Sequence, residues 1–238
     1  MPRPREEARF RHPRHERRGE PRLPAVAATL VAIALYLFLP QRLLIAPRYV
    51  LPALECVLLV PLIAINPRRL TRQTRAFRVL SLTLVALIGA SNLFALGILV
   101  HELVSAGVKD GRELLVASLQ IWLTNIIVFG LAYWELDRGG PVSRTQVPRA
   151  SLPLADFRFS QDENAGAVQE VSDGSSKSAD WVPTLMDYLY VSVTNSTAFS
   201  PTDTMPLSTR AKFLMSVESV TALLTSLLVI ARAVSILH

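Results

Sequence analysis

Long apolar runs are the feature of this sequence that most restricts its fold. A helix that crosses a membrane needs ~20 mostly apolar residues, because it rises about 1.5 Å per residue through about 30 Å of hydrocarbon. Half of the chain is apolar and 18% is charged, and the apolar residues form continuous runs. We therefore predict an all-α, polytopic transmembrane helical bundle with about six membrane-embedded helices. The runs are 24–40, 49–65, 77–100, 113–134, 181–200 and 211–237.

Three of these runs leave alternatives open. The runs at 24–40 and 49–65 are short, so each fits either a spanning helix or a buried or interfacial helix. The run at 181–200 contains Asp187 and a cluster of Ser, Thr and Asn, and is predicted either to span fully or to be re-entrant. As a helix it would extend about 30 Å, which slightly favours the full span.

The distribution of Lys and Arg predicts the orientation of the helices. With a cytoplasmic N-terminus and six spans, nineteen of the 25 Lys and Arg fall in inside segments. Residues 1–23 carry eight Arg and are expected to form a disordered cytoplasmic tail, with attraction to anionic lipid headgroups as the alternative. Topology also explains the pI of about 10, without nucleic acid as a partner. We expect a multi-pass protein of the plasma membrane, surrounded by the lipid bilayer.

The segment after the fourth run differs in composition from the rest of the chain. It is rich in Gly, Pro and Ser and then in acidic residues, so we predict an irregular acidic loop on the cytoplasmic side. Within it, LADFRF could dock on the protein or the membrane surface through Phe157 and Phe159. The predicted parts are a basic tail (1–23), a four-helix membrane region (24–135), the loop (136–180) and a membrane hairpin (181–238).

Motifs of known enzymes are lacking. No nucleotide-binding, zinc or serine-hydrolase motif occurs, and the four His are scattered. We therefore expect neither an enzyme nor a cofactor or metal site. The single cysteine, Cys56, lies in an apolar run and can form no intrachain disulfide.

Polar and charged side chains inside the apolar runs are the candidates for function, because charge in hydrocarbon is costly and usually faces protein or water. Glu55 is equally consistent with a functional acid and with a structural hydrogen-bond partner. Glu218 also fits an ion pair with Lys212 or Arg210, and Asp187 a place at the membrane boundary. Interhelical hydrogen bonding is the alternative for the uncharged groups. The candidates for a pore or polar path are Glu55, Asp187, Asn195, Ser196, Thr197, Asp203 and Glu218.

The stretch NSTAFSPTDTMP is predicted to be a structured joint between two helices. Its first residues, Asn195, Ser196 and Thr197, are consecutive, so no single helix face can hide all three from lipid. At least one of them must turn toward a neighbouring helix, a partner subunit or water. Thr202 or Asp203 is predicted to cap the helix that follows.

The sequence from DYLYVSVTNSTAFSPTD through MPLSTRAKFLMSVESV resembles the pore module of bacterial potassium channels, in which a short helix, a filter and a long inner helix follow one another. Thr197 and Asp203 match the filter threonine and aspartate, and Glu218 matches the inner-helix glutamate. Phe199 and Pro201, however, stand at the places of the filter glycines, whose backbone conformations they resist. The filter motif is therefore not retained, and potassium selectivity is not expected.

A second resemblance covers most of the chain. The motif YWELDRGGP and the stretch NSTAFSPTDTMP are similar to segments of uncharacterised bacterial membrane proteins, which implies a bacterial inner membrane but no activity. We predict an ion or small-solute channel or transporter, monomeric or homo-oligomeric, without a potassium-selective filter. The alternative is a non-transporting membrane protein that binds a partner or lipid through the loop 136–180 or the basic tail.

Overall fold

The computed structural model describes residues 18–105, 111–163, 166–173, 181–197 and 203–237. This part of the chain is mostly helical, which confirms the all-α prediction. Three helices are long and apolar enough to cross a membrane, and two further apolar helices are shorter. The principal helices are α2 (Leu23–Leu37), α3 (Val50–Ile65), α4 (Arg75–Val104), α5 (Gly111–Leu136), α8 (Leu185–Thr197) and α9 (Thr209–Leu237).

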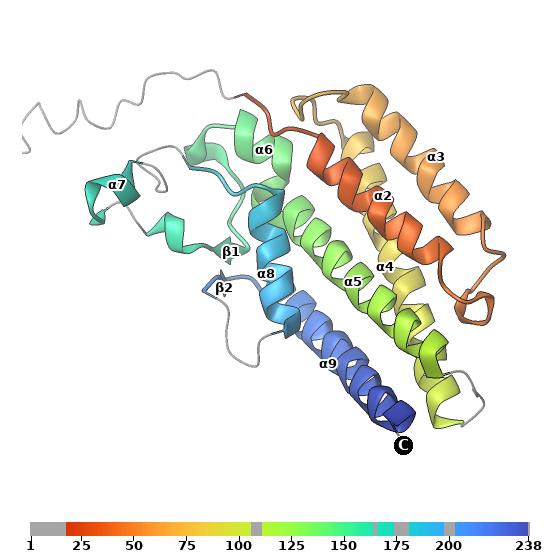
Figure 1. Cartoon of the computed structure of the whole chain (residues 1–238). Helices are drawn as coiled ribbons and strands as arrows, with labels where there is room; N and C mark the ends of the chain where they lie inside the picture. The colour runs from red at the N-terminus through yellow and green to blue at the C-terminus, as the bar shows by residue number, and fades with distance from the viewer. Residues whose placement is uncertain (1–17, 106–110, 164–165, 174–180, 198–202, 238) are drawn as a thin grey trace, which may run out of the picture.

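Helix α5 lies at the centre of the bundle and packs against α2, α4, α8 and α9, while α3 packs on α4 (Figure 1). The first helices are made of the predicted apolar runs, and local signals set where some of them begin. Pro24 lies in the first turn of α2, where its missing N–H costs nothing. Thr74 caps α4, because its side chain accepts a hydrogen bond from the Phe77 amide at 3.1 Å.

The bundle has two ends, and short elements cover one of them. We call it the α6 end, after helix α6 (Pro141–Gln146), which follows α5. The loop between α2 and α3, the last turn of α4 and the first turn of α5 lie at the opposite end (Figure 1). The shorter elements are η1 (Gln41–Leu43), η2 (Asp137–Gly139), η3 (Arg149–Ser151), η4 (Ser160–Asp162), α7 (Gln169–Ser172), β1 (Phe157–Arg158) and β2 (Met205–Pro206).

Helix α8 enters the bundle from the α6 end, and the chain then returns to that end. Strand β2, just before α9, pairs antiparallel with β1, so that Pro206 lies opposite Phe157. Arg210, in the first turn of α9, donates to the carbonyl oxygen of Leu136 at 3.1 Å. The 13 residues of α8 would extend only about 20 Å. The chain therefore enters this part of the bundle and leaves it again at the same end.

A tight turn separates α5 from the elements that cover the α6 end. Arg138, Gly139 and Gly140 all have positive φ angles, of 50°, 81° and 96°. A Cβ atom on Gly140 would lie 2.7 Å from Nη1 of Arg78, so both the conformation and the space favour glycine. The following segment was predicted to be mostly irregular, but its first half packs onto the bundle through Phe157 and Phe159, which are 1% and 4% exposed. Their predicted docking is confirmed.

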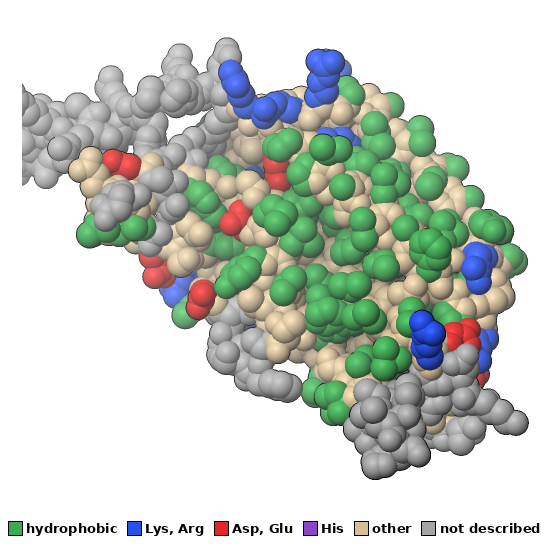
Figure 2. Space-filling model, viewed as in Figure 1, with side chains coloured by type: hydrophobic (Ala, Val, Ile, Leu, Met, Phe, Trp, Pro, Cys, Tyr) green, Lys and Arg blue, Asp and Glu red, His purple; other side chains and the backbone are tan. Residues whose placement is uncertain are grey.

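Apolar side chains dominate the face of the bundle shown in Figure 2, and charged side chains lie mainly toward its two ends. Some of the exposed side chains are large, such as Val57 on α3 and Phe213 and Ile230 on α9, which are 65%, 66% and 61% exposed. Such an apolar belt between two charged ends is the surface expected of a protein surrounded by lipid.

Candidate functional site

A buried carboxylate lies where α5, α8 and α9 meet. Glu218 of α9 is fully buried. Oη of Tyr133 and Nδ2 of Asn195 donate to its Oε2 atom, at 2.5 and 2.6 Å. Oγ of Ser196 donates to Oε1 at 3.2 Å, and Oγ of Ser192 donates to the same oxygen. We call Glu218 and these four donors the carboxylate cluster.

The spacing of residues on α8 brings three of the donors together. Ser192, Asn195 and Ser196 are three and four residues apart, so they lie on one face of the helix. Helix α8 also comes very close to α5 at Gly130, where a Cβ atom would lie 3.2 Å from the Cα atom of Leu189. A larger side chain at this position would push α8, and the donors on it, away from the carboxylate.

The polar contacts continue beyond the carboxylate cluster. Nδ2 of Asn195 also donates to the carbonyl oxygen of Met215 at 3.0 Å, and Oγ of Ser219 donates to Oδ1 of Asn195 at 3.1 Å. Nearly one turn further along α9, Oγ1 of Thr221 donates to Oδ1 of Asn125 on α5 at 3.1 Å. A seam of interhelical hydrogen bonds therefore runs along the buried side of α9.

The three consecutive polar residues at the end of α8 divide between two surfaces. Asn195 and Ser196 turn toward Glu218, as at least one of the three was expected to do. Thr197 is exposed and bonds within its own helix, to the carbonyl oxygen of Val193 at 2.8 Å. Among the candidates from the sequence, the structure thus brings together Asn195, Ser196 and Glu218.

The ion pair considered for Glu218 does not form. Arg210 instead pairs with Asp156, which precedes β1. Lys212 forms no salt bridge with any described residue, and its exposed side chain lies outside the carboxylate cluster. The alternative of an ion pair with either residue is not observed, because Tyr133 and the polar face of α8 already occupy both carboxylate oxygens.

Glu55 is a second buried acid in an apolar helix, but its surroundings are different. It lies on α3 and is 1% exposed, and neither carboxylate oxygen has a hydrogen-bond partner among the described residues. The hydroxyl group of Tyr36, on α2, is also buried without a partner in the described part of the chain. Glu55 is therefore not a member of the carboxylate cluster.

Asp187 and Asp203 are not members of the cluster either. Oδ2 of Asp187 accepts hydrogen bonds from the amide and the hydroxyl group of Thr184, at 2.7 and 2.8 Å, so it caps the start of α8. Asp203 is exposed and does not cap α9. The cap is Ser208, whose Oγ accepts from the Ala211 amide at 3.1 Å. The cap prediction for Asp203 was wrong, because α9 begins six residues later, at Thr209. Thr202, the other predicted cap, lies outside the described residues.

A buried acid, which composition and charge gave no reason to expect, lies in the predicted tail. Glu20 is 7% exposed and accepts from the Leu185 amide at 2.7 Å and from Nε1 of Trp134 at 2.9 Å. Nη2 of the buried Arg144 lies 3.9 Å from it. Burial raises the pKa of Glu20, while the Leu185 and Trp134 hydrogen bonds and the Arg144 charge oppose that rise. Nearby Asp187 also raises this pKa slightly.

The tail was expected to be disordered, but its last residues form an ordered part of the fold. The amide of Leu70 donates to the Glu20 carbonyl oxygen at 3.0 Å, and the amide of Arg22 donates to that of Arg68 at 3.1 Å. The expectation was therefore wrong for residues 18–22, and residues 1–17 lie outside the described part of the chain. The Arg-rich composition of residues 1–23 gave no sign that this segment is ordered, because a count of charges does not show that one acid among them is buried and paired.

A further missed residue lies in the motif YWELDRGGP. Asp137 is fully buried and accepts from the amides of Asp156 and Phe157, at 2.7 and 3.3 Å. It also accepts from Oη of Tyr188 at 2.5 Å, which ties the end of α5 to both α8 and the loop. The signal was present in the sequence, since the motif was noticed as a resemblance, but nothing local indicated what its aspartate would bind.

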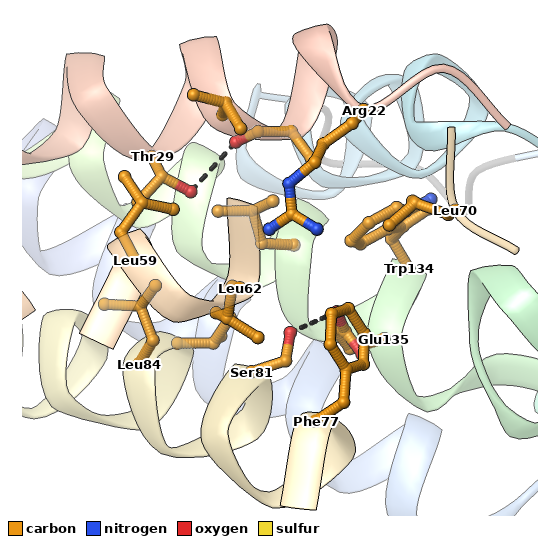
Figure 3. A pocket seen from close by; sticks show the side chains of 14 residues that line it. Arg22, Thr29, Leu59, Leu62, Leu70, Phe77, Ser81, Leu84, Trp134 and Glu135 are labelled. Carbon is orange, nitrogen blue, oxygen red and sulfur yellow. Dashed lines mark hydrogen bonds between the residues drawn. The ribbon is translucent and has the colours of Figure 1, made fainter. Parts of the chain in front are cut away.

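A small cavity of about 30 Å³ lies between α2, α3, α4 and α5 near the α6 end (Figure 3). Arg22 is 6% exposed and points into it, and its Nε and Nη1 atoms have no partner among the described residues. Burial lowers the pKa of Arg22, and the charge of Glu135 opposes this. Glu135 itself accepts from the hydroxyl group of Ser81. The cavity has room for about one or two water molecules, which could bridge Arg22 to Glu135.

Comparison with known proteins adds no functional assignment: no family model, no curated protein and no solved structure matches the chain.

Proposed function

We propose that the protein is a multi-pass protein of the plasma membrane that moves a cation, or a small solute together with protons. The observation that carries this proposal is Glu218, a carboxylate in the middle of an apolar helix long enough to cross a membrane. An acid at such a depth is costly, and acids there commonly mark ion paths and proton relays. A carboxylate favours cations and protons over anions.

The arrangement of α8 and α9 supports this proposal. A short helix enters the bundle, the chain returns to the end from which it came, and a long helix follows. This is the order of elements in the pore module that the sequence resembles. Phe199 and Pro201, which replace the filter glycines, lie outside the described residues. Because these two residues resist the backbone conformations of the filter glycines, the proposal includes no potassium-selective filter.

Charge also supports an orientation with the α6 end in the cytoplasm. If α8 is re-entrant, Arg210 and Lys212 join the cytoplasmic side and Arg232 leaves it. Counted by sequence position, twenty of the 25 Lys and Arg are then cytoplasmic, one more than with six full spans.

The test is a flux measurement with the purified protein in liposomes, using gradients of Na⁺, K⁺ and H⁺, with Glu218→Gln as the key variant. Glutamine has nearly the same shape and can keep the cluster satisfied. Its oxygen can accept from Tyr133 and Asn195, and its amide can donate to Ser192 and Ser196. Ser192 can accept there, because its single O–H can instead donate to the carbonyl oxygen of Ile126, which lies 2.8 Å away.

We expect Glu218→Gln to fold normally but to lose most of the flux and its dependence on pH. The matched control is Thr197→Val, which changes an exposed residue of the same helical segment and should leave the flux unchanged. Wild-type flux in a Glu218→Gln variant of normal stability would show that the cluster is only structural. Wild-type liposomes that pass none of these ions, with or without a small solute present, would exclude transport.

One observation favours the alternative, a non-transporting protein that binds a partner through the loop 136–180. Helix α7 stands away from the helical bundle (Figure 1), and the preceding Val168 is 61% exposed. Replacing residues 166–173 by a Gly/Ser linker separates the two functions. If the protein is a transporter, the variant should keep its flux. If the protein instead binds a partner through the loop, the variant should lose a partner that can be cross-linked to the wild type.

A further inference from the structure

A basic groove lies at the α6 end, between the start of α4 and α6. Its volume is about 480 Å³, and its lining includes the side chains of Arg75 and Arg78 and the hydroxyl-bearing residues Thr71, Thr74 and Ser143. Figure 2 shows Lys and Arg side chains gathered at this end of the molecule. The groove thus combines positive charge with hydrogen-bond donors, which is the combination that binds phosphate groups.

The Arg residues around the groove form no ion pair with a described acidic residue, although the charge of Arg78 acts on the buried Glu135. Five Arg residues lie between 68 and 78. Arg69 and Arg78 donate to backbone carbonyl oxygens, whereas the Arg75 side chain is exposed and bonds to no described residue. Arg75 is therefore the side chain most available to an anion from outside.

The position of the groove indicates which kind of anion it binds. Arg75 is the first residue of one helix that is long and apolar enough to cross a membrane, and the span that contains α5 ends at Gly139. Gln73, in the groove lining, donates to the Gly139 carbonyl oxygen at 3.1 Å. If these helices cross the bilayer, the groove lies at the level of the headgroups. One turn into α4, Val79 is 64% exposed and offers apolar surface to an acyl chain.

We propose that this groove binds the phosphate of an anionic lipid headgroup in the cytoplasmic leaflet. Arg75 donates two hydrogen bonds to the phosphate oxygens, the hydroxyl group of Thr71 adds a further donor, and the acyl chains lie along α4 beside Val79. This site depends on the membrane location proposed above, but not on transport, so flux plays no part in its test.

The experiment measures thermal unfolding of the full chain in detergent while phosphatidylglycerol, phosphatidylcholine or inorganic phosphate is added. Arg75→Gln removes the charge, and Arg75→Lys keeps it. Lys212→Gln is the matched control, because Lys212 is an exposed cation at the same end of the bundle, on α9 and outside the groove lining. We expect phosphatidylglycerol to raise the melting temperature of the wild type more than phosphatidylcholine does, with inorganic phosphate giving little shift.

We expect Arg75→Gln to weaken the apparent affinity for phosphatidylglycerol roughly five-fold, the effect of one basic residue near an anionic surface. Lys212→Gln should retain nearly all of the affinity, and Arg75→Lys, which keeps the charge but loses the paired hydrogen bonds, should lie between the wild type and Arg75→Gln. Equal losses in Arg75→Gln and Lys212→Gln would show a general charge effect and overturn the site. An equal response to both lipids would also overturn it, and a full shift with inorganic phosphate would show that the groove takes phosphate from solution instead of lipid.

Discussion

Glu218 and Glu55 are both buried acids in apolar helices, but only Glu218 lies in a network of donors. Its oxygens accept from four side chains on α5 and α8, whereas the oxygens of Glu55 have no partner among the described residues. Burying a carboxylate costs free energy unless it is hydrogen-bonded or protonated. The difference shows that burial alone does not identify a functional site. The hydrogen-bond donors around Glu218 are what distinguish it from Glu55.

Removal of the Glu218 carboxylate should have the largest effect. Glu218→Ala removes the shared acceptor of four donors, three of them buried, and opens a cavity, so we expect the free energy of unfolding to fall by about 3–5 kcal/mol. Chemical denaturation in detergent micelles measures this loss. Glu218→Gln should lose less than about 1.5 kcal/mol. If the alanine variant were as stable as the glutamine variant, the four donors would contribute little.

Asn195 should be the most sensitive of the donors, because its side chain contacts Glu218, Met215 and Ser219. We expect Asn195→Leu to lower the free energy of unfolding by about 2–3 kcal/mol. Thr197→Val, two residues later and exposed, should change it by less than about 0.5 kcal/mol. Equal effects in the same denaturation assay would contradict the division of α8 into a buried polar face and an exposed one.

Replacement of Glu55 should change the free energy of unfolding in the opposite direction from replacement of Glu218. Glu55→Leu removes a buried polar group that has no described partner. We therefore expect the free energy of unfolding to stay at the wild-type value or to rise by up to about 1–2 kcal/mol. A thermal unfolding scan in detergent is sufficient to see the sign. A loss of 2 kcal/mol or more would mean that Glu55 has a partner in solution, such as a water molecule, a cation or a second copy of the chain.

The smallest effect concerns the start of α9. Ser208→Ala removes the cap, together with the hydrogen bond that the same hydroxyl group donates to Asp156, and should lower the free energy of unfolding by about 0.5–2 kcal/mol. Asp203→Ala should change it by less than about 0.5 kcal/mol, because Asp203 is exposed and caps nothing. Circular dichroism during denaturation compares the two variants, and the reverse order would restore the cap that the sequence suggested for Asp203.

The sequence was sufficient for the long helices, because run length and composition determine whether a segment can be α4, α5 or α9. It was not sufficient for the return of the chain after α8. That return depends on the pairing of β1 with β2, which lie 47 residues apart along the chain at Arg158 and Met205. A run of 20 partly apolar residues looks the same whether it spans or returns.

The carboxylate cluster was predictable in part. Glu218, Asn195 and Ser196 were chosen because polar groups in apolar runs need partners, and the three do bond to one another. Tyr133 was not chosen, because a tyrosine near the end of an apolar helix is common at membrane interfaces and its hydroxyl group gives no sign of its acceptor. Ser192 belongs to the cluster of Ser, Thr and Asn in the run 181–200, but its sequence context does not distinguish it from an ordinary interhelical contact.

The contact between Glu20 and the Leu185 amide joins residues 165 positions apart, and this separation has a consequence for biosynthesis. The ribosome adds about 5–20 residues per second, so Glu20 emerges on the order of ten seconds or more before its partner exists. Until then, the N-terminal segment has only earlier-made contacts, such as the one with Trp134. The joint between the N-terminal segment and α8 is therefore closed among the last steps of assembly, and a chain truncated before Leu185 cannot close it.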